Sequence, residues 1–311
     1  MRIPIRQYLP VPGIRGVLWG VLCLAFLAGI LLGARPIATS GEQDAAIRGL
    51  WVWKGPSILE VPRGTEALRD FCESQGINEI YISVSEGGRE ADDALLVHLI
   101  DVLHRSDIRV EALLSSEDAD EPGKHREKLL DHVRAILQFN QDHPRSRFDG
   151  IHLDIEPQQR PENKGAGNLS FLPDLVNAYR DVRALAQPAH LTVNADIQNK
   201  LLKGDSTQRK MLLSSLPYLT LMLYELSSPN DGESVEQKTD KLRAESQKYL
   251  DMAYDGLNEP DLARLIIGLR TPDYEDLLPK MLESLDTANH SNSHYAGWAR
   301  HSYNDSLQPP N

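Results

Sequence analysis

The sequence contains little cysteine: two residues in 311, Cys23 and Cys72. Cys23 lies inside an apolar run near the amino terminus, so Cys72 stands alone in the rest of the chain and no internal disulfide is expected there. A zinc site built on cysteines is excluded for the same reason. Basic residues are also scarce, 33 Lys and Arg against 45 Asp and Glu, for a formal net charge of −12. This balance argues against nucleic acid or anionic lipid as the main partner.

Two sequence patterns are absent as well. No glycine-rich phosphate loop follows an early strand-like segment, which argues against the alternative fold, a doubly wound open sheet. There is also no internal repeat and no low-complexity block. The chain is therefore expected to form one ordinary globular domain after its amino-terminal segment.

Residues 1–34 combine a basic start with a long apolar run. Arg2, Arg6 and Arg15 precede residues 17–34, which carry no charge. This order is typical of a signal peptide or a signal-anchor helix, and the run is close to the roughly 20 residues that a membrane-spanning helix needs. The basic residues predict that the rest of the chain lies outside the cytoplasm, either membrane-anchored or secreted into an extracytoplasmic space such as a periplasm. Residues 35–47, small and polar, are expected to be a linker.

From there on, strand-like and helix-like segments alternate. Eight short apolar segments rich in Val, Ile, Leu and aromatic residues predict buried strands at 49–54, 77–85, 109–115, 148–156, 191–197, 218–225, 263–271 and 294–301. Apolar residues at three- and four-residue spacing predict helices at 65–75, 92–105, 124–141, 172–186, 235–254 and 274–288. Only a short helix is expected at 208–216. The alternation predicts a (β/α)8 TIM barrel over residues 48–302, followed by a polar tail at 303–311.

The fourth predicted strand, FDGIHLDIEP at 148–157, contains an unusual row of ionisable residues. Strand side chains alternate between faces, so His152, Asp154 and Glu156 share one face and are expected to point into the barrel. Catalytic groups of such barrels gather at the carboxyl ends of the strands, where this row ends. A structural polar network at the barrel mouth is the alternative interpretation.

This stretch resembles the strand-four signature of family 18 glycoside hydrolases, the chitinase-like barrels, which reads Asp-Gly-x-Asp-x-Asp-x-Glu. Asp149, Gly150, Asp154 and Glu156 match it, whereas His152 replaces the middle aspartate. Later in the chain, Met222-Leu223-Tyr224-Glu225 is similar to the family's Met-x-Tyr-Asp, and Trp298 fits the aromatic platform that such barrels place under a sugar.

The resemblance implies a division of roles. Glu156 would be the acid that protonates the leaving oxygen, and Asp154 would assist it. An N-acetyl group of the sugar would act as the nucleophile, held by Asp154 and Tyr224. The residues expected to bind substrate are Asp149, His152, Asn194, Tyr224, Glu225 and Trp298.

Several of these residues have a second interpretation. Asp149 fits a turn or supporting residue as well as a catalytic one, and Trp298 fits barrel packing as well as sugar stacking. His152 could be a structural histidine, a direct catalyst or part of a metal site. If protonated, it is expected to lower the pKa of Asp154 and keep that carboxyl group ionised.

The sequence thus predicts an exported glycoside hydrolase-like enzyme that acts on a polysaccharide or oligosaccharide without a cofactor or metal. Two alternatives remain. A non-hydrolytic glycan-binding or scaffolding barrel is favoured by the loss of the acid at 152 and opposed by Glu156. A metal-dependent phosphodiesterase barrel usually places His and Glu ligands on its first two strands, and the segments at 49–54 and 77–85 lack that pattern.

Overall fold

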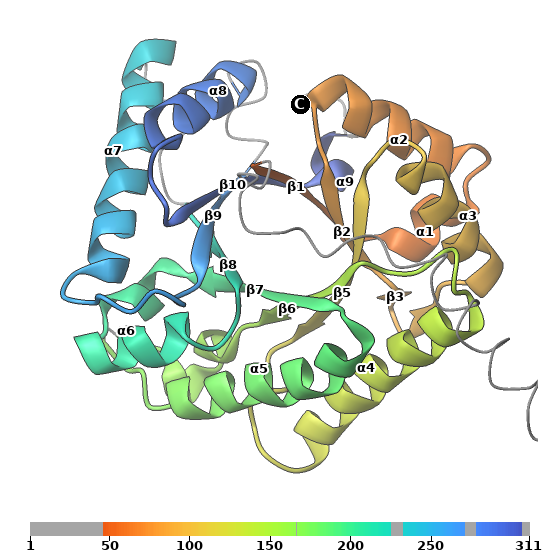
Figure 1. The fold of residues 1–311 in the computed structure, drawn as a ribbon, viewed down its shortest axis with the longest axis horizontal. Coiled ribbons are helices and arrows are strands. Elements are labelled where there is room, and N and C mark those ends of the chain that lie inside the picture. Colours follow the sequence, from red (N-terminus) through yellow and green to blue (C-terminus); the bar gives the residue numbers. More distant parts are fainter. Residues whose placement is uncertain (1–45, 166, 225–232, 271–277, 307–311) are drawn as a thin grey trace, which may run out of the picture. The chain divides into compact units, whose positions relative to one another are not determined.

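The structure is a computed structural model that describes residues 46–165, 167–224, 233–270 and 278–306. Eight parallel strands close into a barrel (Figure 1). Each pairs with its neighbour in chain order, and the last pairs with the first. The barrel strands are β1 (Ile47–Val52), β2 (Glu79–Ser83), β5 (Arg109–Ser116), β6 (Gly150–Ile155), β7 (Thr192–Gln198), β8 (Tyr218–Met222), β9 (Arg264–Arg270) and β10 (Tyr295–His301).

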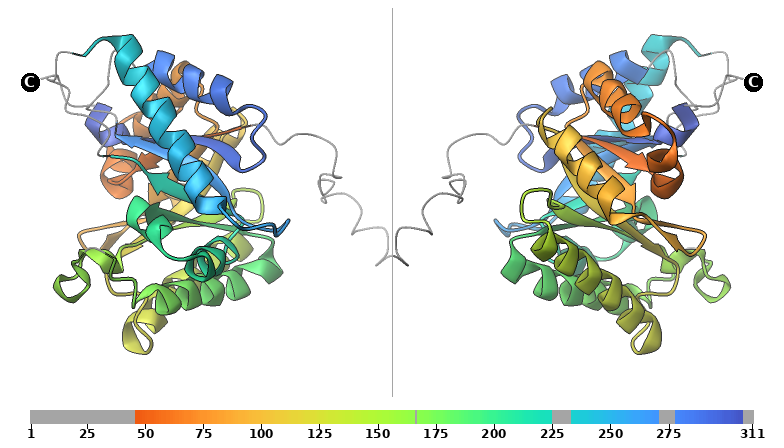
Figure 2. Two further views of the ribbon diagram at one scale, coloured as in Figure 1. Left: turned by 90° about the vertical axis from the view of Figure 1, so that its left-hand side faces the viewer. Right: turned by 90° about the vertical axis from the view of Figure 1, so that its right-hand side faces the viewer.

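Helices surround this barrel on the outside, as the side views show (Figure 2). They are α1 (Gly55–Glu60), α2 (Gly64–Gln75), α3 (Asp93–His104), α4 (Lys124–Asp142), α5 (Leu172–Ala186), α6 (Ser206–Leu213), α7 (Val235–Tyr254), α8 (Leu278–Asn289) and α9 (Tyr303–Ser306). The connections contain the two-stranded hairpin β3 (Ser85–Glu86) and β4 (Arg89–Glu90), and the 3-10 turns η1 (Pro157–Gln159), η2 (Pro161–Asn163), η3 (Gln187–Ala189) and η4 (Asn199–Lys203).

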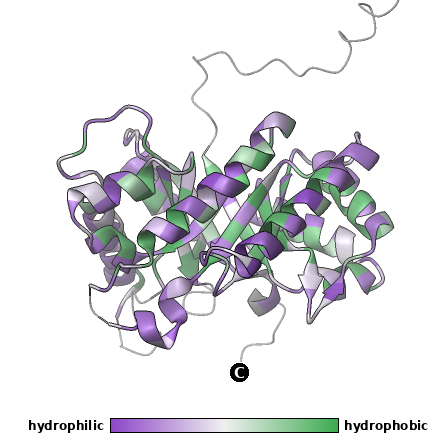
Figure 3. Ribbon diagram, turned by 90° about the horizontal axis from the view of Figure 1, so that it is seen from below, coloured by the Kyte–Doolittle hydropathy of each residue, from purple (hydrophilic) through white to green (hydrophobic). Residues whose placement is uncertain are grey.

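The helices α3, α6 and α7 each begin at a capping side chain. Asp92 accepts hydrogen bonds from the first backbone N–H groups of α3. Asp205 and Ser234 form capping boxes with Gln208 and Gln237 at the starts of α6 and α7. Such caps satisfy backbone donors that the first helical turn leaves unpaired. Along the helices, hydrophilic and hydrophobic residues alternate (Figure 3), which is the pattern of helices that bury one face.

The strands bury both of their faces. On β6, Ile151, Leu153 and Ile155 belong to the large apolar layer between strands and helices. The barrel interior has its own smaller apolar cluster, which includes Trp51 and Tyr81. Because β6 alternates, His152 and Asp154 face this interior, as the sequence predicted.

The predicted (β/α)8 barrel is confirmed, because each of the eight expected strands overlaps one barrel strand. The short helix expected after the fifth strand is α6. The signal or anchor segment and most of the linker lie outside the described residues. Among the residues that are described, no helix is long and apolar enough to cross a membrane.

Candidate active site

A cleft opens at the carboxyl ends of the barrel strands, where the row on β6 ends. Its volume is about 330 Å³. The side chains that line it come from the ends of β1, β6, β7, β8 and β10 and from the turns that follow β6, β7 and β8. They are Trp53, Asp154, Glu156, Gln159, Gln198, Asn199, Met222, Tyr224 and His301. Of the predicted site residues, the structure brings Asp154, Glu156 and Tyr224 together here.

Glu156 follows the last residue of β6 and is oriented by amide groups. Its Oε1 accepts hydrogen bonds from Gln198 Nε2 at 2.9 Å and from Gln158 Nε2 at 3.0 Å. Gln159 Nε2 approaches both carboxyl oxygens at 3.4 and 3.5 Å. Pro157 begins the 3-10 turn η1 directly after it. Glu156 is therefore held at the cleft in a defined orientation.

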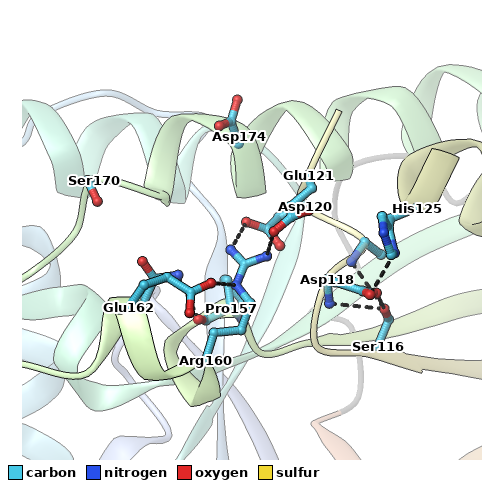
Figure 4. A network of polar contacts seen from close by, with 12 residues as sticks. Ser116, Asp118, Asp120, Glu121, His125, Pro157, Arg160, Glu162, Ser170 and Asp174 are labelled. Atoms are coloured by element: carbon cyan, nitrogen blue, oxygen red, sulfur yellow. Dashed lines mark hydrogen bonds and ion pairs between the residues drawn. The ribbon is translucent and has the colours of Figure 1, made fainter. Parts of the chain in front are cut away.

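The turn after β6, which carries Gln158 and Gln159, is held in place by Arg160. Its guanidinium donates to Asp120 Oδ2 at 2.8 Å and to Glu121 Oε1 at 2.6 Å, and lies 3.4 Å from Glu162 Oε1 (Figure 4). The side chain of Arg160 is 13% exposed. This cation ties the turn after β6 to the loop after β5, so it stabilises the wall of the cleft beside Glu156.

Asp154 is almost completely buried, at 6% exposure. Its Oδ2 accepts a hydrogen bond from Ser115 Oγ at 3.1 Å, whereas Oδ1 has no partner among the described residues. Burial, followed by the nearby charges of Asp196 and Glu156, raises the pKa of Asp154 well above its usual value. The carboxyl group therefore holds its proton to higher pH than an exposed aspartate, and one oxygen is left for a ligand to satisfy.

His152 lies beneath the cleft and does not line it. Its Nε2 donates to Asp196 Oδ1 at 2.9 Å, and its Nδ1 lies 3.5 Å from Glu111 Oε2 without hydrogen-bond geometry. The ring stacks on Tyr81, with centroids 3.7 Å apart. Burial alone would lower the pKa of His152, but Asp196 and Glu111 outweigh it and raise the pKa to about 10. His152 is thus a buried cation between two carboxylates.

This arrangement corrects the expectation that a protonated His152 keeps Asp154 ionised. The positive charge of His152 does lower the pKa of Asp154, but burial and the Asp196 and Glu156 carboxylates act more strongly in the opposite direction. Asp196 also has a second partner besides His152, because Trp51 Nε1 donates a hydrogen bond to its Oδ2 at 3.0 Å.

Asn194 also lies inside the barrel and does not line the cleft. Its Nδ2 donates to both oxygens of Glu111, at 2.9 and 3.0 Å. It pairs in register with His152 on the neighbouring strand, at a depth below the cleft. The structure therefore gives it a supporting contact to Glu111 in place of the expected contact with substrate.

An aromatic wall of Trp53, Tyr224 and His301 faces the cleft. Trp53 Nε1 donates to His301 Nε2 at 2.9 Å, and the rings of Tyr224 and His301 lie 5.3 Å apart. Burial, followed by the charges of Asp196, Asp154 and Glu156, raises the pKa of Tyr224, so its hydroxyl stays a hydrogen-bond donor. His301 and Gln198 were not predicted as site residues from the sequence, although both lie at the carboxyl ends of strands.

Two predicted site residues lie elsewhere. Asp149 precedes β6 at the opposite end of the barrel, where its Oδ2 accepts from Val110 N and lies 2.9 Å from His104 Nε2. Trp298 points outward from β10, and its Nε1 donates to Asp286 of α8 at 3.2 Å. Trp298 borders a second hollow of about 470 Å³, larger than the cleft, which lies outside the barrel and away from the carboxyl ends of the strands. Neither residue can reach the cleft. Glu225 lies outside the described residues.

No group of three or more His, Cys, Asp and Glu side chains in the described ranges is arranged to hold a metal ion.

No protein-family model matches the chain, and a search of the curated proteins finds no match. Solved structures do resemble it. The C-terminal domain of a predicted chitinase from Desulfitobacterium hafniense has a TM-score of 0.50 at 13% identity, over 73% of this chain and 67% of that one. A β-1,3-glucanosyltransferase mutant from Rhizomucor miehei, solved with laminaritriose, also has a TM-score of 0.50 at 13% identity, over 81% of this chain and 85% of that one. The chain thus shares the closed (β/α)8 fold of these two solved structures.

Proposed function

We propose that this protein is a glycoside hydrolase-like enzyme that cleaves a polysaccharide, with Glu156 as the proton donor and Asp154 as its assistant. One observation carries the proposal. The nearly buried Asp154 has an oxygen without a partner among the described residues, and it lines the same cleft as the amide-oriented Glu156. Most glycoside hydrolases use two carboxyl groups beside the bond to be cleaved, and TIM barrels place their catalytic groups at the carboxyl ends of the strands.

The proposed chemistry follows from where each group lies. Glu156 gives its proton to the leaving oxygen as the bond to the sugar's anomeric carbon breaks. The family resemblance implies that the acetamido oxygen of an N-acetyl sugar attacks that carbon. Asp154, with its raised pKa, and the Tyr224 hydroxyl then supply hydrogen bonds to the acetamido group. Water completes the cycle by adding to the cyclic intermediate while Glu156 recovers a proton.

His152 gives a specific reason to keep a second candidate, a glycan-binding barrel without turnover. The resemblance implies an aspartate at this position that shares charge with Asp154. Here the His152 charge is engaged by Asp196 and Glu111, so it does not replace that partner. The accessible and oriented Glu156 supports hydrolysis nevertheless.

We further propose that the enzyme works outside the cytoplasm. This rests on the basic and apolar character of residues 1–34, which are retained as an anchor or cleaved after export.

The test is product release from a polysaccharide panel that includes N-acetylated glycans, glucans and mannans. Wild type is expected to release sugars from at least one member. Glu156→Gln should lower kcat by about 10² to 10⁴-fold with binding retained, because it removes only the proton donor. Glu283→Gln, on α8 beside the outer hollow, is the matched control and should leave kcat unchanged. If wild type binds a glycan but releases nothing from any member, the hydrolase proposal fails and the binding barrel stands.

A further inference from the structure

Trp53 follows the last residue of β1, and its side chain lines the cleft. Of the aromatic side chains that line the cleft, its indole offers the largest apolar face. Trp298, which the sequence led us to expect under a sugar, faces α8 instead. Trp53 is therefore placed to pack against the apolar face of a bound sugar ring. A ring held in one orientation before the sugar arrives binds it more tightly, because less freedom is lost on binding.

Two side chains from the end of β10 and from α9 hold Trp53. His301 Nε2 accepts a hydrogen bond from Trp53 Nε1 at 2.9 Å. Asn304 Oδ1 accepts one from the backbone N–H of Trp53 at 3.0 Å. The first bond fixes the indole ring, and the second fixes the backbone from which the ring extends. We call His301 and Asn304 the Trp53 clamp.

The clamp is itself attached to rigid parts of the barrel. Tyr303, which lies between the two clamp residues, is 3% exposed and packs edge-on against Phe71 of α2, with ring centroids 5.2 Å apart. The His301 ring lies 5.9 Å from that of Trp51, whose Nε1 is bonded to the buried Asp196. The clamp is thus supported by the helix layer on one side and by the barrel interior on the other, as a site that orients a ligand requires.

The bond between Trp53 and His301 also assigns the protonation of the imidazole. An indole N–H can only donate, so Nε2 of His301 carries no proton, and the neutral ring holds its proton on Nδ1. Replacement by leucine removes the acceptor, whereas glutamine offers a carbonyl oxygen near the position of Nε2. The hydrogen bond can therefore be tested apart from the volume of the side chain.

We infer that His301 and Asn304 are positioning residues that hold Trp53 as the ring on which a sugar of an N-acetylated glycan stacks. This inference rests on the proposed function and adds to it the residues that orient the bound glycan. Glu156 is oriented separately, by the amide groups of Gln158 and Gln198. Loosening Trp53 should therefore weaken glycan binding and change the chemical step much less.

The first experiment measures hydrogen exchange of the indole N–H groups by NMR in the full chain without a ligand, with Trp53→Phe to identify the signal of Trp53. His301→Leu should speed the exchange of the Trp53 N–H about tenfold or more, and His301→Gln should restore part of the protection. The N–H of Trp298, which is bonded to Asp286 outside the barrel, is the internal control and should not change. Unchanged exchange at Trp53, or an equal rise at Trp298, would overturn the inference.

The second experiment measures binding of an N-acetylglucosamine tetramer by calorimetry, with Glu156→Gln present in every variant to prevent turnover. His301→Leu and Asn304→Ala should each weaken binding about threefold or more, and His301→Gln should recover part of it. The control His98→Leu, on the exposed side of α3, should change binding by less than about twofold.

A double-mutant cycle shows whether His301 acts through Trp53. Trp53→Phe keeps an aromatic ring but has no N–H to donate. In that background His301→Leu should weaken binding of the tetramer by less than about twofold further, because the bond is already lost. Fully additive losses would show that His301 acts independently of Trp53 and would contradict the clamp.

Kinetics with Glu156 intact separates this inference from the proposed function. His301→Leu should raise KM for the tetramer about threefold or more and change kcat by less than about twofold. A fall in kcat with KM unchanged would overturn the inference and leave hydrolysis standing. If the tetramer binds through the clamp but is not cleaved, hydrolysis is refuted and the clamp stands. If it does not bind while another glycan of the panel is cleaved, the inference fails and hydrolysis stands.

Discussion

His152 Nε2 lies 2.9 Å from Asp196 Oδ1 inside the closed barrel, and both side chains are cut off from solvent. A histidine at this point of β6 is therefore part of a buried ion pair that supports the floor of the cleft. Ions in such a pair depend on each other, because removing one leaves the other buried without compensation.

Replacing His152 alone should be costly. We expect His152→Gln to lower the free energy of unfolding by about 3–5 kcal/mol at pH 7, because Asp196 loses its cation. His152→Gln with Asp196→Asn should recover part of that loss, since the pair is then uncharged. Urea unfolding monitored by circular dichroism measures both. The surface control His98→Gln, which removes an exposed ion pair with Glu66, should cost less than about 1 kcal/mol.

The same pair predicts a dependence of stability on pH. The pKa of His152 is raised to about 10 in the folded protein, from an ordinary value of 6.5. The contribution of the protonated His152 to the free energy of unfolding is therefore complete below pH about 6.5 and is lost as pH rises through about 10. Wild type should lose stability between pH 7 and 10, and the double variant should lose less. Identical slopes in the two proteins would show that His152 is not charged in the folded state.

Restoring the aspartate of the family motif should not restore its chemistry. His152→Asp would place a third carboxylate between Asp196 and Glu111, 2.9 and 3.5 Å from the present imidazole. We expect a lower free energy of unfolding than for His152→Gln and no gain in kcat. A stable variant with higher kcat would contradict the ion-pair account.

Trp53 and Trp298 should behave differently when truncated. Trp53→Ala should raise KM for a glycan, because its ring faces the cleft beside His301. Trp298→Ala should instead lower the free energy of unfolding by about 3–5 kcal/mol with KM unchanged, since this ring is buried against α8. Steady-state kinetics and urea unfolding on both variants check this. If KM rises for Trp298→Ala and not for Trp53→Ala, the assignment of Trp53 to substrate binding and of Trp298 to packing is wrong.

Arg160 is expected to act as a positioning residue through the turn that holds Glu156. Arg160→Gln should lower kcat about tenfold or more with a smaller change in KM, because the amides of Gln158 and Gln159 lose their fixed places. Arg160→Lys should recover part of kcat by keeping the charge. The control Arg134→Gln removes an exposed ion pair on α4 and should leave kcat unchanged. An equal fall for both arginines would exclude the positioning role.

Much of this fold follows from simple periodicity. The alternation along β6 predicts that Ile151 and Leu153 face the helices while His152 and Asp154 face the interior, and the structure agrees. Alternation gives the face of a residue but not its depth. Asn194 faces inward as expected, yet its pairing with His152 places it below the cleft, and that register cannot be read from one strand.

The position of Trp298 outside the cleft, where the sequence led us to expect a substrate-binding residue, has a related cause. The pairing of β10 with β9 shifts register between Tyr295 and Gly297, and from there Ala299 faces the interior while Trp298 faces α8. His301, two residues after Ala299, then points to the cleft. The position of His301 at the end of the eighth predicted strand could have indicated a site residue. Trp298 was chosen on that strand because of its large aromatic side chain.

The central claim is that Glu156 protonates the leaving oxygen, and leaving-group dependence tests it most directly. Glu156→Ala should be measured on a natural oligosaccharide and on a matched aryl glycoside whose phenol leaves without protonation. The account predicts a fall in kcat/KM, which reports the step in which the leaving group departs, of about 10² to 10⁴-fold on the oligosaccharide and a much smaller fall on the aryl glycoside. Equal losses on both substrates would contradict the assignment of Glu156 as the proton donor.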